Sequence, residues 1–130
     1  MNRRSTPEAD AQRAIVQALR FALPRDAIVH HSANEVAEAG SCGQIRQSIL
    51  VGMGVHAGFA DLIVISGGRV MFLEVKSQTG RLRKSQEVFR DTVCAQGFGW
   101  ALVRSVDDAL AALADNGFTS RVRSARRVQP

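Results

Sequence analysis

Residues 61 to 76, DLIVISGGRVMFLEVK, constrain the fold of this chain more than any other stretch. Two apolar runs rich in β-branched residues, Leu62 to Ile65 and Val70 to Lys76, are separated by Gly67-Gly68. Paired glycines between such runs favour a two-residue turn, because glycine readily adopts the positive φ that these turns need. The stretch therefore predicts a β-hairpin with antiparallel strands.

The elements expected around the hairpin indicate an α/β fold. Thr6-Pro7-Glu8 carries a capping residue, a proline at the first helical position and an acid in the first turn, which together start a helix. The predicted order is that helix ending at Pro24, a strand at 27–33, a loop at 34–43, a helix at 44–54, the hairpin, a helix at 84–96, a strand at 98–105 and a last helix ending at Gly117. This order predicts a small mixed β-sheet flanked by helices.

Length and composition limit the number of domains and the classes of protein to which this chain can belong. A chain of 130 residues, 45% of them hydrophobic, suits one globular domain, which we expect at 1–117. No apolar run reaches the roughly 18 residues of a membrane span, and no apolar stretch follows the two arginines at the N-terminus. We therefore expect a cytoplasmic protein with no membrane association.

A basic tail at 118–130 carries most of the net charge of +5. It contains four arginines and no acidic residue, so the preceding domain is nearly neutral. Such a tail can bind phosphate backbones without sequence preference. A solvated chain end accounts for the same composition, and the sequence leaves both interpretations open.

Three charged residues are expected to converge where the hairpin strands begin and end. Side chains alternate along a strand, so Glu74 and Lys76 point to one face while Val75 points to the other. Antiparallel pairing then brings Asp61, which precedes the first strand, close to them. One lysine cannot neutralise two neighbouring carboxylates, whereas a divalent ion such as Mg²⁺ can, and this set suits phosphodiester hydrolysis. The simpler alternative is an ion pair at a strand end.

These residues resemble a known family in an ordered series of motifs. The stretches GVHAGFADLIVI and GGRVMFLEVKSQTGRLRKSQ are similar to the VRR-NUC domain, the virus-type replication-repair nuclease of the PD-(D/E)xK superfamily. The likeness extends to HHSANE at 30–35 and to GFGWALVRSVDDALAAL at 97–113. It departs at Ala60, where the family has proline, and at 83–86, where RKSQ replaces Ser-Pro-Glu-Gln. The resemblance implies a restriction-endonuclease-like core.

The resemblance also implies roles for individual residues. Asp61 and Glu74 hold the metal, Mg²⁺ or Mn²⁺, together with the backbone carbonyl of Val75. Lys76 is the catalytic lysine, and Gln86 reaches the site from the following helix. Glu8 is the acid that the first helix contributes to catalysis and metal binding. Two other observations leave this last assignment open, because Glu8 also suits a helix N-terminus and Glu35 competes for the role.

Basic residues are expected to contact DNA beside this site. Arg83 and Lys84 stand where a helix is predicted to begin, and cations there oppose the helix dipole. A phosphate bound at the helix N-terminus would offset that cost. Arg81, Arg83 and Lys84 are therefore candidate DNA-binding residues, and an exposed, screened turn is the alternative.

The function expected from the resemblance is metal-dependent, structure-specific DNA cleavage. Standalone members of the family resemble homodimeric phage or bacterial endonucleases that act on branched DNA such as four-way junctions. Two alternatives remain: a non-catalytic nucleic-acid-binding module, and an accessory subunit of a replication or repair complex that acts with a helicase. The intact set of Asp61, Glu74 and Lys76 favours the enzyme.

Overall fold

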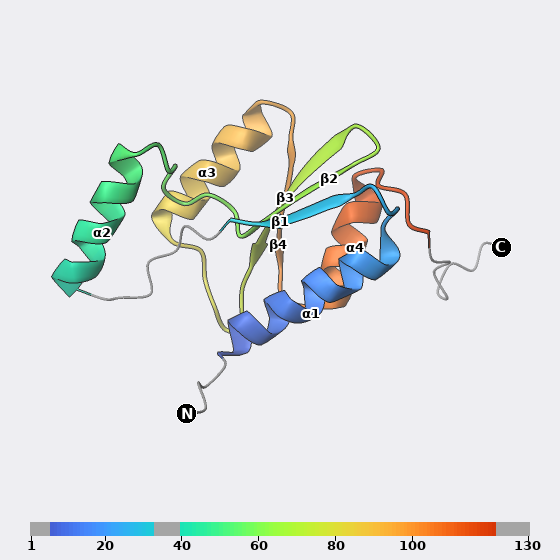
Figure 1. Cartoon of the computed structure of the whole chain (residues 1–130), viewed down its shortest axis with the longest axis horizontal. Helices are drawn as coiled ribbons and strands as arrows, with labels where there is room; N and C mark the ends of the chain where they lie inside the picture. Colours follow the sequence, from blue (N-terminus) through green and yellow to red (C-terminus); the bar gives the residue numbers. More distant parts are fainter. Residues whose placement is uncertain (1–5, 33–39, 122–130) are drawn as a thin grey trace.

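The computed structural model describes residues 6–32 and 40–121, which form four helices and four strands (Figure 1). Glu35 and the arginines beyond Arg121 lie outside these residues. The elements are, in order, α1 (Pro7–Ala22), β1 (Ile28–His31), α2 (Gly40–Gly52), β2 (Leu62–Ser66), β3 (Arg69–Val75), α3 (Lys84–Ala95), β4 (Gly99–Val103) and α4 (Val106–Asp115). The predicted order is confirmed. The predicted start of the second helix at Gln44 is wrong, since α2 begins at Gly40; composition alone fixes helix ends poorly.

The strands form one mixed sheet in the order β1-β2-β3-β4. β2 pairs antiparallel with both β1 and β3, whereas β4 runs parallel to β3. The turn between β2 and β3 has φ values of 60° at Gly67 and 77° at Gly68, the positive values expected from the sequence. The prediction of a small mixed sheet flanked by helices is therefore confirmed.

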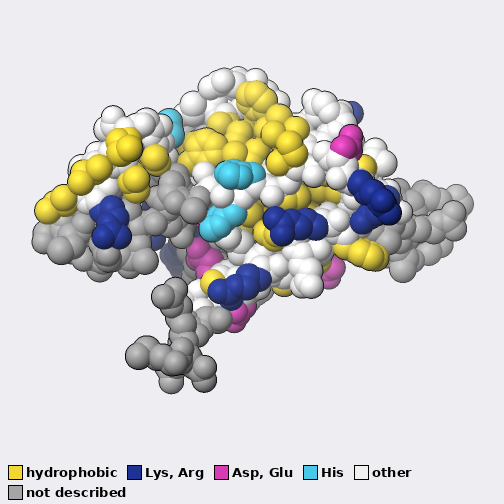
Figure 2. Space-filling model, in the orientation of Figure 1, with side chains coloured by type: hydrophobic (Ala, Val, Ile, Leu, Met, Phe, Trp, Pro, Cys, Tyr) yellow, Lys and Arg dark blue, Asp and Glu magenta, His cyan; other side chains and the backbone are white. Residues whose placement is uncertain are grey.

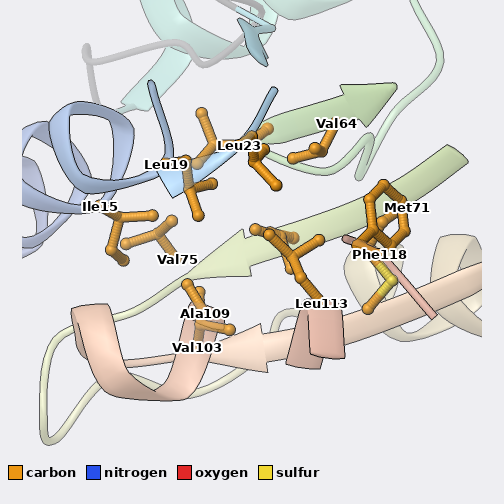
Figure 3. Packing of buried hydrophobic residues seen from close by; sticks show 12 residues of the cluster. Ile15, Leu19, Leu23, Val64, Met71, Val75, Val103, Ala109, Leu113 and Phe118 are labelled. Atoms are coloured by element: carbon orange, nitrogen blue, oxygen red, sulfur yellow. The ribbon is translucent and has the colours of Figure 1, made fainter. Parts of the chain in front are cut away.

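Alternating side chains of β3 separate two layers of packing. Met71, Leu73 and Val75 are fully buried against α1 and α4, within a cluster that also holds Ile15 and Val103 (Figure 3). The residues between them face the other way, toward α3. There, Phe72 packs on a second cluster that contains Ala60, Phe89 and Val93. The odd-numbered positions of β3 thus build the core, and the even-numbered ones are left for the side of the sheet that α3 covers.

The end of α1 is joined to the segment that follows α4. Phe118 is buried in the main cluster, and the backbone N–H of Arg121 donates to the carbonyl oxygen of Ala22 at 2.7 Å. The Arg121 guanidinium also donates to the carbonyl of Phe21 at 2.8 Å. These groups satisfy carbonyls that a helix C-terminus leaves without intrahelical partners. Packing in the described residues therefore continues to Arg121.

None of the helices within residues 6–32 and 40–121 combines the length and apolar character that crossing a bilayer requires.

Candidate active site

Asp61 immediately precedes β2 and is held by the neighbouring strand. Leu62 pairs with Leu73, so one step further along the hairpin Asp61 lies beside Glu74. The Asp61 side chain is almost fully buried and its Oδ2 accepts a hydrogen bond from the backbone N–H of Val75 at 2.8 Å. Hairpin register therefore brings Asp61 to the end of β3, as its sequence position predicts.

Glu74 is the most deeply buried charged residue described, with 1% of its surface exposed. It points toward α3, opposite to the core residues Leu73 and Val75. Its Oε2 accepts a hydrogen bond from Nε2 of Gln86 at 3.0 Å and lies 3.9 Å from Nζ of Lys76. The structure thus joins three of the predicted site residues through a single carboxylate oxygen.

Gln86 connects this carboxylate to the start of α3. Its side-chain carbonyl accepts a hydrogen bond from the backbone N–H of Arg83 at 2.8 Å, while its amide group donates to Glu74. The first bond satisfies a backbone donor at the helix N-terminus, and together the two bonds fix which way the amide points. Gln86 is 5% exposed, and its two hydrogen bonds connect the first turn of α3 to the Glu74 carboxylate.

Lys76 follows β3 directly and is 5% exposed. Its backbone N–H donates to the carbonyl of Val103 at 3.1 Å, which extends the pairing of β3 with β4 by one residue. Its ammonium group remains near Glu74, as strand alternation predicts. Backbone pairing on one side and an ion pair on the other therefore place this lysine within the site.

The charges of this cluster suit a divalent cation. Two nearly buried carboxylates, Asp61 and Glu74, accompany a single ammonium, so the formal charge of the three is −1. Buried charge is stable only when it is paired, hydrogen-bonded or bound to a metal. Carboxylate and carbonyl oxygens are the ligands that Mg²⁺ prefers, and this ion commonly takes one or two protein carboxylates with water and phosphate. The donor set thus fits Mg²⁺ or Mn²⁺.

Within residues 6–32 and 40–121, no hydrogen bond or ion pair joins Glu8 to this cluster. It lies, half-buried, in the first turn of α1 beside the capping residue Thr6, whose Oγ1 accepts from the N–H of Ala9 at 3.0 Å. No group of three or more His, Cys, Asp or Glu within 6–32 and 40–121 is placed to hold a metal ion. The first-turn position of Glu8 is favourable for the helix dipole.

The predicted DNA-binding residues lie at the entrance to α3. Arg81, Arg83 and Lys84 are all exposed, and Arg83 is the residue that caps the helix. Gln86, in the same turn, is buried on Glu74. One short segment therefore presents three cations to solvent and one amide to the buried carboxylates.

Gly58 contributes a contact that the sequence pattern alone does not reveal. Its φ is +77°, and a Cβ atom at this position would lie 2.1 Å from the carbonyl oxygen of Ser85. The loop that leads to Asp61 therefore rests directly on the backbone of α3, next to Gln86. A glycine shortly before a candidate catalytic residue is the only sequence signal for this contact.

Comparison with known proteins supports the fold. No protein-family model matches the chain, and no curated protein matches it. A solved structure described as a "VRR_NUC domain protein" superimposes with a TM-score of 0.65 over 87% of this chain and 89% of that one, at 17% sequence identity. The fold implied by the motifs is therefore present in the backbone, and this chain has the α/β fold of a VRR-NUC domain.

Proposed function

We propose that this chain is a metal-dependent, structure-specific DNA endonuclease that hydrolyses phosphodiester bonds in branched DNA such as four-way junctions. The observation that carries the proposal is the convergence of Asp61, Glu74, Lys76 and Gln86, all buried, at the ends of the hairpin strands. Buried charges are costly to keep and are concentrated at functional sites. The shared fold with a VRR_NUC domain protein supports the same conclusion.

In this proposal the chain's own residues hold the metal and the phosphate. Asp61, Glu74 and the carbonyl of Val75 would be the ligands, and a bound Mg²⁺ or Mn²⁺ would supply Lewis acidity and neutralise charge at the scissile phosphate. Lys76 stabilises negative charge that develops on the phosphate or orients the attacking water. Gln86 keeps Glu74 in place, while Arg81, Arg83 and Lys84 contact neighbouring phosphates. Glu8 or Glu35 supplies a further acid.

The test is a cleavage assay with a panel of labelled DNAs. Wild type and Lys76→Ala are incubated with four-way junction, flap, duplex and single-stranded DNA in Mg²⁺, Mn²⁺ or EDTA. We expect metal-dependent cutting that prefers the junction, and a loss of about 10²-fold in rate for Lys76→Ala, because one electrostatic stabiliser is removed. Binding without cutting, by both proteins in every metal, would instead indicate a binding module. Cutting only after a helicase is added would indicate an accessory subunit of a replication or repair complex in the bacterial or phage-infected cell.

We further propose that the protein acts as a homodimer through the apolar face of α2. Ile45 and Ile49 on α2, and Met53 one residue beyond its end, recur at intervals of four, and 57% or more of each is exposed. Figure 2 shows apolar side chains in a row along this helix. A helix of 13 residues is only marginally stable in water without packing. A two-fold contact between copies would cover this face and present two active sites to the two-fold symmetric junction.

The homodimer is tested by light scattering coupled to gel filtration. Wild type is expected to elute as a dimer and Ile49→Glu as a folded monomer, because a charge is placed in the middle of the apolar face. Phe21→Glu is the matched control, since Phe21 is 67% exposed but lies on α1. A monomeric wild type, or an Ile49→Glu dimer as stable as wild type, would contradict this interface.

A further inference from the structure

Arg104 follows β4 and reaches across to the turn that comes after Lys76. Its Nη1 donates hydrogen bonds to two backbone carbonyls, those of Ser77 and Gly80, the latter at 2.9 Å. Ser77 and Gly80 form the turn's ends, because the Gly80 N–H also donates to the Ser77 carbonyl at 3.1 Å. Backbone pairing of β3 with β4 stops at Lys76, and the Arg104 side chain continues the connection around the turn.

The turn held by Arg104 lies directly on the Lys76 side chain. A Cβ atom added at Gly80 would be 3.4 Å from both Cβ and Cδ of Lys76. This is close packing against the aliphatic stem of the lysine, and it accounts for part of its burial. With the stem covered on this side, the ammonium group remains 3.9 Å from Glu74.

Arg104 is itself fixed from α4. Its backbone N–H donates to Oδ2 of Asp108 at 3.0 Å, and the N–H of Asp108 donates to the side chain of Ser105 at 3.1 Å. Arg104 is half-buried, and its guanidinium donates to carbonyls rather than to a carboxylate. A cation directed at two carbonyls of one turn is suited to holding that turn in place.

We propose that Arg104 is a positioning residue for Lys76: it clamps the Ser77–Gly80 turn onto the lysine stem and so keeps the ammonium beside Glu74. The catalytic consequence rests on the proposed nuclease function, whereas the effect on Lys76 does not. Without the guanidinium, the Ser77–Gly80 turn loses two hydrogen bonds and can move away from Lys76. The Lys76 side chain then becomes more exposed, and its ammonium group moves away from its position beside Glu74. Displacements of about 1 Å in an active site can cost on the order of 10²-fold in rate.

The first readout is lysine reactivity, which needs no nuclease activity. The chain has two lysines, Lys76 and Lys84, and Lys84 is exposed. The metal-free protein is treated with an amine-acetylating reagent, and the labelling rates at the two positions are compared by peptide mass spectrometry. In Arg104→Ala the Lys76-to-Lys84 ratio is expected to rise about tenfold or more, because two hydrogen bonds no longer oppose local opening. Arg104→Gln, which keeps a polar side chain but ends short of the carbonyls, replaces it should the alanine variant not fold.

Arg121→Ala is the matched control. Arg121 also donates from its guanidinium to two backbone carbonyls, of Phe21 and Arg20, but it does so at the end of α1. It therefore reports what losing a carbonyl-bound arginine does to the fold in general. We expect the labelling ratio and kcat at saturating DNA to match wild type in this variant.

The second readout separates chemistry from binding. In Arg104→Ala, kcat for DNA cleavage is expected to fall about 10- to 100-fold, while the Kd for DNA in EDTA stays within about threefold of wild type. An unchanged Lys76 labelling ratio in folded Arg104→Ala or Arg104→Gln would overturn the positioning role. Equal losses of kcat in Arg104→Ala and Arg121→Ala would overturn it as well. A wild type that cuts no DNA counts against the proposed function, and the labelling ratio then decides the role of Arg104 by itself.

Discussion

Asp61→Asn is expected to lower the rate of DNA cleavage by at least about 10³-fold while leaving the fold intact. Asparagine has the shape of aspartate, and its side-chain carbonyl can still accept the hydrogen bond from the Val75 N–H, now 2.8 Å from Oδ2. What is lost is one of the two carboxylates proposed to hold the metal. Metal-ion stabilisation of a transition state is worth several kcal/mol, and each 1.36 kcal/mol is about tenfold in rate.

The same substitution is expected to alter stability in opposite ways with and without metal. In EDTA, Asp61→Asn should unfold at the same temperature as wild type or higher, because one of two neighbouring buried carboxylates is neutralised. If Asp61 holds a metal, Mg²⁺ at about 100 times its Kd is expected to stabilise the wild type by about 2.7 kcal/mol, which corresponds to a rise on the order of 10 °C in Tm. This rise should be absent in Asp61→Asn.

The matched control for this substitution is Asp10→Asn. Asp10 lies on α1, has 61% of its side chain exposed and pairs with Arg13. Surface pairs of this kind contribute little, so cleavage rate, Tm and the effect of Mg²⁺ should all match wild type. DNA binding in EDTA should be within about threefold of wild type for both variants, since Asp61 is proposed to act on chemistry. An Asp61→Asn protein that Mg²⁺ stabilises as much as wild type would exclude Asp61 as a ligand.

The parts of this site that could be predicted from the sequence are those set by local periodicity. Gly67-Gly68 determines the antiparallel hairpin, and the hairpin places Asp61 beside Glu74. Alternation along β3 then sends Val75 into the core and leaves Glu74 and Lys76 on the other face. Each of these steps follows from a period of two and a turn of known length.

Which side chains of the helices are buried was harder to predict from the sequence, because burial depends on which elements pack against each helix. The apolar pattern of the helix at 84–96 predicts that Val88 and Val93 face inward, with Phe89 as a further candidate. The prediction is wrong for Val88, which is 49% exposed, whereas Phe89 and Val93 are buried. α3 contacts the sheet along a narrow stripe that includes Gln86, so a polar residue takes a buried position and an apolar one does not. The hydrogen bond of Gln86 to the buried Glu74 here overrides hydrophobic patterning.

Contacts between residues far apart in the chain could not be predicted from the sequence. Arg104 and the Ser77–Gly80 turn are 24 and 27 residues apart, and they meet only because β4 lies parallel to β3. The family resemblance places Gln86 at the site, but its hydrogen bond to the Glu74 carboxylate is found only in the structure. Parallel pairing of strands distant in the chain is a property of the whole fold, so residues that act across it are found only in the structure.

Gly58→Ala is expected to destabilise the protein by about 2–5 kcal/mol, a large part of the about 5–15 kcal/mol that holds a domain folded. One contribution is backbone strain of about 1–2 kcal/mol, because φ at this position is +77°. The other is overpacking, worth about 1–3 kcal/mol, because the new Cβ would lie 2.1 Å from the Ser85 carbonyl oxygen and 2.8 Å from the Gln86 nitrogen. Backbone atoms cannot rotate away as a side chain can.

Gly68→Ala separates these two contributions. Gly68 has the same φ of +77°, but nothing lies within 4 Å of the Cβ that would be added there. Gly68→Ala should therefore cost only the strain, about 1–2 kcal/mol, as measured by urea unfolding. The difference between the two variants measures the contact between the Gly58 loop and α3. If Gly58→Ala and Gly68→Ala lose the same stability, the Gly58 loop and α3 can separate without an energetic cost. The contact between them then does not position the helix.

The two alanine variants should differ in activity as well as in stability. Relief of the clash at Gly58 is expected to push the Gly58 loop and the first turn of α3 apart, and that turn carries the Gln86 amide now 3.0 Å from Glu74. Cleavage by the folded fraction of Gly58→Ala should thus fall about 10- to 100-fold, whereas Gly68→Ala, at the opposite end of the hairpin, should cut as wild type does. The comparison is made at a temperature where both are folded, so that a rate loss confined to Gly58→Ala reports displacement of the α3 turn. Since Gly58 itself carries no functional group, such a loss would establish that the close approach of two backbones, set by one glycine, aligns Gln86 with the buried carboxylate.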